Sequence, residues 1–131
     1  NKALHIALPH DNRPCDVIAL SKLDALVQSG LWERQAYKTF YLTLTDILRE
    51  YLLKRFGLDT SADTSLEMLR RLKNSHQELI TPLLPQLRQF LSSSDLVKFA
   101  RAVPPEQYRN RDVQTVREVV QKTLPPKPEA R

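Results

Sequence analysis

The stretch FYLTLTDILREYLLKRFGL, residues 40–58, decides the fold class of this chain. Its apolar side chains recur every three or four positions, which is the period of a helix with one buried face. Gly57 ends the pattern, as glycine does where a helix closes in a left-handed conformation. We therefore predict one long helix over residues 32–56, about 37 Å in length, as the spine of the domain. Its expected inward residues are Tyr37, Phe40, Tyr41, Leu44, Leu48, Tyr51, Leu52 and Phe56, with Ile47 at the edge.

One shorter helix is predicted before this spine and another after it. Asp16 is the expected N-cap of the first, over residues 16–29, and Gly30 is the expected left-handed residue after it. Thr64 and Glu67 predict a capping box at the start of the next, because each side chain then satisfies a free amide of the other residue. The expected inward residues are Val17, Leu20, Leu23 and Val27 in the first, and Leu66, Met68, Leu69 and Leu72 in the second.

Prolines and serines divide the second half of the chain. Pro82 suits the first turn of a fourth helix, where a missing amide hydrogen costs nothing. The run Ser92–Ser94 predicts a break or bend, followed by a short fifth helix over residues 95–100 that Pro104 and Pro105 end. A last helix is predicted over residues 110–123, with Asn110 as its cap. Its expected inward residues are Val113, Val116, Val120 and Leu124.

The composition agrees with an all-helical protein. Only two glycines occur in 131 residues, and no run of about 18 apolar residues exists that would span a membrane. The prediction is an all-α fold, a compact bundle of five to six helices with one long central helix. It consists of an extended leader (1–14), a single helical domain (15–124) and a proline-rich tail (125–131).

The sequence contains few of the patterns that enzymes use. It has no phosphate-binding glycine loop and no nucleophile-elbow serine. His5, His10 and Cys15 match no zinc-ligand spacing, and His76 is expected in a solvent-facing turn. We therefore predict no catalytic site, no cofactor and no metal. The lone cysteine excludes an internal disulfide and favours a reducing compartment; it is expected to be half-buried, and Trp32 to pack in the core or at a hinge.

The positive charge is confined to the second half of the chain. Residues 1–65 carry 8 basic and 8 acidic side chains, whereas residues 66–131 carry 12 and 7. Such a bias often serves solubility, and it also suits an alternative function, a basic helical module that docks on nucleic acid or an anionic membrane surface. Nucleic acid is the less favoured partner, because no aromatic side chains alternate with the basic ones. The basic residues concerned are Arg70, Arg71, Lys73, Lys98, Arg101, Arg109 and Arg111.

Three segments resemble a known bacterial family. Residues 45–52, the turn Arg55-Phe56-Gly57 and residues 95–100 are similar to motifs in the C-terminal cytoplasmic domain of BatD-like aerotolerance membrane proteins and their uncharacterised relatives. The resemblance covers most of residues 16–122. Residues 59–67 depart from the family pattern, because they keep the capping threonine and lack the glutamate-arginine pair that often precedes it.

This resemblance implies a cellular context and no reaction. Such domains follow a transmembrane helix, which would precede Asn1, and lie on the cytoplasmic face of the bacterial inner membrane. A MoxR-type AAA+ ATPase or a von Willebrand factor A domain protein is the partner that it implies. We therefore expect a non-catalytic interaction or regulatory domain.

Charged side chains on two predicted helices form the candidate interaction site. If the long helix and the helix over residues 95–100 pack side by side, these charges meet. One interpretation is a partner-binding surface. The other is a set of internal salt bridges, in which Asp95 caps its own helix and Arg49 or Arg55 pairs across the bundle. The residues are Asp46, Arg49, Glu50, Arg55, Asp95, Lys98 and Arg101.

Overall fold

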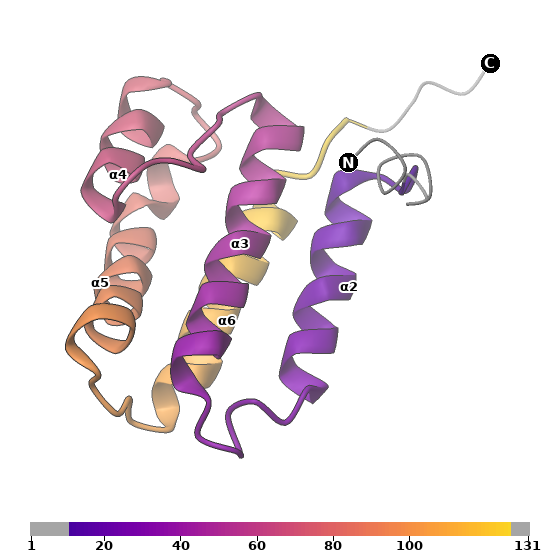
Figure 1. Cartoon of the computed structure of the whole chain (residues 1–131). Helices are drawn as coiled ribbons and strands as arrows, with labels where there is room; N and C mark the ends of the chain where they lie inside the picture. The colour runs from indigo at the N-terminus through magenta and orange to yellow at the C-terminus, as the bar shows by residue number, and fades with distance from the viewer. Residues whose placement is uncertain (1–10, 127–131) are drawn as a thin grey trace, which may run out of the picture.

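Four helices form a closed ring around one core, and a fifth lies outside it. The computed structural model describes residues 11–126. The ring consists of α2 (Cys15–Gln28), α3 (Tyr37–Phe56), α5 (Leu84–Ala100) and α6 (Gln107–Lys122), each packed against the next, and α3 also contacts α6 across it. α4 (Ser65–Asn74) packs on the outside of α5 (Figure 1). This arrangement confirms the predicted all-α bundle with one long central helix.

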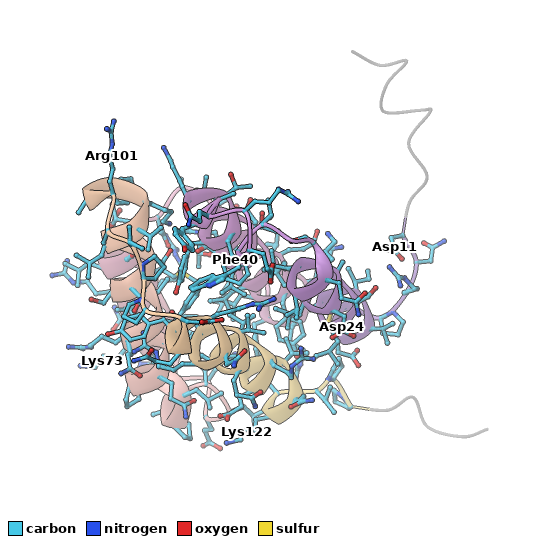
Figure 2. The ribbon with its side chains drawn as sticks, turned by 90° about the horizontal axis from the view of Figure 1, so that it is seen from below. Asp11, Asp24, Phe40, Lys73, Arg101 and Lys122 are labelled. Carbon is cyan, nitrogen blue, oxygen red and sulfur yellow. The ribbon has the colours of Figure 1, made fainter. Side chains whose placement is uncertain are left out.

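The predicted inward face of α3 is the centre of the core. Phe40, Tyr41, Leu44, Leu48, Tyr51 and Leu52 are buried, and Ile47 is buried too. Figure 2 shows Phe40 in the middle of the bundle. Gly57 caps the helix with φ 71°, and its amide donates to the carbonyl of Leu53 at 2.8 Å, so the predicted glycine stop is correct.

The long helix begins later than predicted. Residues 31–35 form a turn rather than the first turn of α3, and Gln35 has a left-handed φ of 62°. The amide of Ala36 closes this turn by donating to the carbonyl of Leu31. Trp32 is buried there, as predicted, and α3 therefore starts at Tyr37 with 20 residues.

The run of serines does not interrupt the helix, which corrects the prediction of two separate helices. α5 continues from Leu84 to Ala100, preceded by one 3₁₀ turn, η1 (Thr81–Leu83), that contains Pro82. Ser93 and Ser94 are buried, and the hydroxyl of Ser93 donates to the carbonyl of Gln89 one turn earlier. A serine hydroxyl that donates to a carbonyl of its own helix has a hydrogen-bond partner without breaking the helix. The described residues therefore contain five α-helices, within the predicted five to six.

Helix ends show the other differences from the sequence predictions. The predicted capping box of α4 is present, with both the Thr64 and the Glu67 bond formed. Neither Asp16 nor Asn110 is a cap, because α2 and α6 each begin earlier, after Pro14 and Glu106. Three predicted inward residues, Val17, Leu66 and Leu124, are exposed.

Candidate functional site

An apolar groove lies between α2 and α3 and has a volume of about 450 Å³. Leu26 and Ile47 are buried core residues, one from each helix, and each lines the groove with one edge. Ala25 of α2 also lines the groove, and its side chain is a single methyl group. The remaining lining residues are Lys22, Ser29, Leu31, Thr43, Asp46 and Glu50.

The charged rim of this groove contains one carboxylate that is not neutralised. Lys22 reaches from α2 and donates to Glu50 of α3 at 2.8 Å, and Lys54 approaches the same carboxylate at 3.8 Å. Asp46, one turn before Glu50, is exposed and forms no ion pair within residues 11–126. The groove thus combines an apolar wall with a carboxylate that is free to accept from a partner's cation.

Arg49 and Arg55, two of the candidate interaction residues, hold the chain together. Arg49 donates to the carbonyl of Thr60, and to that of Asp63 at 3.0 Å, which fixes the loop before α4. Arg55 donates to the carbonyl of Thr123 at 2.7 Å, where α6 ends. The predicted pairing across the bundle therefore goes to backbone carbonyls and not to the carboxylates of an ion pair.

The candidate residues on α5 also differ from the predicted salt-bridge set. Asp95 lies inside α5 and accepts from the hydroxyl of Ser65 at 2.8 Å, so it joins α4 to α5 rather than capping its own helix. Lys98 is half-buried, and burial lowers its pKa. Arg101 is exposed and ends α5 in a left-handed conformation, φ 55°. α3 and α5 do pack together, yet no ion pair joins their candidate residues, all of which the structure describes.

A buried polar cluster that the sequence analysis missed connects three helices. Asp112 of α6 is fully buried; the hydroxyl of Tyr41 donates to it at 2.6 Å, and the guanidinium of Arg111 at 3.1 Å. Arg111 also donates to Ser93 of α5 and lies 3.8 Å over the ring of Tyr108. Burial raises the pKa of Asp112, opposed by these two donors. Since solvent does not reach the carboxylate, the cluster is suited to structure rather than to catalysis.

Some of the basic residues proposed for nucleic-acid binding form ion pairs within the domain instead. Arg71 pairs with Asp63 at 2.7 Å, and Arg109 pairs with Glu33 at 2.9 Å. Arg70, Lys73 and Arg101 are exposed. The basic surface therefore divides into structural cations and a smaller group on α4 and at the end of α5 that faces solvent.

The remaining sequence candidates fall outside this groove. His76 is exposed in a turn, and Cys15 is half-buried at the start of α2, both as predicted. His5 and His10 lie outside the described residues. Within residues 11–126 no three histidine, cysteine or acidic side chains gather as metal ligands. None of the helices in this part of the chain combines the length and the hydropathy of a membrane span.

Comparisons with known proteins add no relative: no family model, no curated protein and no solved structure matches this chain. The BatD-like resemblance therefore stays a prediction that rests on the residues quoted for it.

We expect Arg49→Ala to destabilise the fold by about 1–3 kcal/mol, because two half-buried loop carbonyls lose a charged donor. Arg70→Ala is the matched control, since Arg70 is exposed and no hydrogen bond of its side chain is seen in residues 11–126. Urea denaturation followed by circular dichroism measures both variants. If Arg49→Ala leaves stability unchanged and weakens binding to a partner, this residue belongs to a binding surface instead.

Proposed function

We propose that this chain is a non-catalytic protein-interaction domain whose α2–α3 groove receives an apolar side chain from a partner protein. The observation that carries the proposal is the groove itself, an apolar cavity of about 450 Å³ with charged residues only at its rim. Grooves between helices commonly bind partner helices through a few apolar anchors. A partner segment with an apolar anchor and a neighbouring lysine or arginine fits best, because the carboxylate of Asp46 then gains a counter-charge.

The identity of the partner rests on the resemblance to BatD-like proteins. It supports a MoxR-type AAA+ ATPase, or a von Willebrand factor A domain protein that works with it, at the cytoplasmic face of the bacterial inner membrane. A non-catalytic role has a separate support. The groove contains no histidine, cysteine or buried carboxylate that would transfer a proton or act as a nucleophile.

Ala25→Trp tests the groove, because an indole at this position fills the cavity without disturbing the core. Ala25 is exposed on α2, so we expect stability to change by no more than about 0.5 kcal/mol. Loss of an anchored contact of this kind typically weakens binding by about tenfold or more. Gln121→Trp adds the same ring at an exposed position on α6 and is the matched control.

The measurement has two stages. Proteins retained from a native lysate by the wild-type domain and by Gln121→Trp, but lost with Ala25→Trp, are identified first. Each protein identified in this way is then purified, as is a MoxR-type ATPase from the same genome. Both are titrated by calorimetry against all three forms of the domain. Equal affinity for all three forms contradicts the use of the groove. Recovery of nucleic acid alone contradicts the proposed function.

A further inference from the structure

A second groove, between α4 and α5 on the side away from α2, has a volume of about 330 Å³. Its lining combines apolar and basic side chains and contains no acidic residue. Leu69 and Lys73 come from α4, and Leu84, Pro85 and Arg88 come from the first turns of α5. Figure 2 shows Lys73 at the outer edge of the molecule on the α4–α5 side.

Exposed apolar residues extend the line of this groove. Leu66 precedes Leu69 by three residues and therefore lies on the same face of α4, 57% exposed. Leu96 and Phe99 follow Arg88 by eight and eleven residues, which also places them on one face of α5, and they are 53% and 78% exposed. Exposed apolar side chains that share a face with an apolar groove indicate an interaction site. α4 leaves the last turn of α5 uncovered, since its first residue already contacts Asp95 (Figure 1).

The charge of this face determines the kind of partner. Lys73 and Arg88 border the groove, and neither forms an ion pair within residues 11–126. Asp95, the one carboxylate of α5, does not line the groove; it accepts from the hydroxyl of Ser65 at 2.8 Å and keeps its charge near the far end of the strip. Two cations beside an apolar groove are complementary to a segment with an apolar face and carboxylates beside it.

The length of the strip favours a helix as the bound segment. From Pro85 to Phe99 the strip covers 14 residue steps of α5, about 21 Å at 1.5 Å per step. A partner helix of about four turns laid along α4 and α5 presents anchors at the spacing of the leucines. A concave groove between two helices suits such a helix better than the flat surface of a bilayer.

From these observations we propose that the α4–α5 groove binds an acidic amphipathic helix of a protein partner. This second docking surface is independent of the α2–α3 groove and lies on the opposite side of the bundle. The leucines and Phe99 hold the apolar face of the partner helix. Lys73 and Arg88 pair with glutamate or aspartate side chains along its edges.

The test uses a synthetic four-turn peptide with leucines along one face and glutamates beside them, and a twin in which lysines replace the glutamates. Titration into the isotope-labelled domain, followed by amide NMR shifts, measures affinity and location together. We expect the glutamate peptide to bind and to shift amides of α4 and α5, with affinity that falls as salt rises. The lysine twin is expected not to bind.

Charge-reversal variants make the outcome specific. The double variant Lys73→Glu with Arg88→Glu is expected to bind the glutamate peptide at least about tenfold more weakly, because like charges then face each other. Lys38→Glu with Arg34→Glu changes the net charge equally at exposed positions elsewhere and is expected to leave affinity unchanged. Ala25→Trp is expected to have no effect, which separates this result from a test of the α2–α3 groove.

Three results overturn the proposal. They are no binding of the glutamate peptide at any attainable concentration, equal binding of the lysine twin, and shifts that fall outside α4 and α5. Vesicles of mixed phosphatidylcholine and phosphatidylglycerol are tested in parallel. Binding of the domain to these vesicles without binding to the peptide assigns this face to an anionic membrane instead.

Discussion

Asp112→Ala is expected to lower the free energy of unfolding by about 3–5 kcal/mol, the cost of breaking a buried charged pair by removing one partner. The carboxylate accepts from Tyr41 of α3 at 2.6 Å and from Arg111 at 3.1 Å, and it has no exposure to solvent. Without it, the tyrosine hydroxyl is buried with no acceptor and the guanidinium loses its counter-charge. Because natural domains are stable by only about 5–15 kcal/mol, this variant loses a large share of its stability.

Asp112→Asn keeps one oxygen acceptor and removes the charge, so it separates the effect of the charge on stability from that of the hydrogen bond. We expect a smaller loss of about 1–3 kcal/mol. Urea denaturation of wild type, of both variants, of Tyr41→Phe and of each variant combined with Tyr41→Phe gives the coupling energy between Tyr41 and Asp112 from double-mutant cycles. A loss below about 1 kcal/mol for Asp112→Ala would mean that water or another side chain replaces the carboxylate.

The pH dependence of the wild-type protein tests the same carboxylate without removing it. Burial raises the pKa of Asp112 in the folded state, so the folded protein holds this proton at a pH where the unfolded chain has released it. The contribution of Asp112 to the free energy of unfolding therefore decreases as pH rises from about 4, the pKa of this carboxyl in the unfolded chain, through its higher pKa in the folded state. Because the side chain of the Asp112→Asn variant cannot titrate at position 112, the stability difference between wild type and variant isolates this contribution. A difference that grows in favour of the wild type over that window contradicts the raised pKa.

Helical periodicity was sufficient to predict the long helix and its buried apolar side chains, although not its first residue. The stripe from Phe40 to Leu52 faces the core, and Gly57 ends the helix, because both depend on local spacing that a sequence shows directly. The serine run shows where local reasoning fails. Ser93 and Ser94 are weak helix formers, yet packing against α6 and α3 keeps them helical, and their hydroxyls find partners in the core.

The candidate interaction residues show a second limit of sequence reasoning. The sequence placed Arg49 and Arg55 on a polar strip, and the acceptors that they find are carbonyls 11 and 68 residues away. Such long-range contacts leave no spacing signal in the sequence. The Tyr41–Asp112 bond is of the same kind, since 71 residues separate its partners. Asp112 stands next to Val113, a residue of the predicted inward pattern of α6. This was the one available sign in the sequence of a buried carboxylate.

Trp32→Ala is expected to cost about 3–5 kcal/mol, as for other buried aromatic residues cut to alanine. Its indole packs edge-on against Tyr37 at 5.0 Å and against Phe40 at 5.1 Å between ring centroids. These contacts connect the turn over residues 31–35 to the first turn of α3. Gln35, the last residue of the turn, has a left-handed φ of 62°, and packing of the indole helps to offset this backbone cost.

Far-UV circular dichroism in urea measures this loss, since the variant has no tryptophan left as a fluorescent probe. Leu79→Ala is the control: Leu79 is 48% exposed, and we expect its truncation to change stability by no more than about 0.5 kcal/mol. Trp32→Phe retains a ring and should recover part of the loss. If Trp32→Ala instead costs no more than the control, then the backbone bond from Ala36 to Leu31, and not the indole, holds the turn against α3.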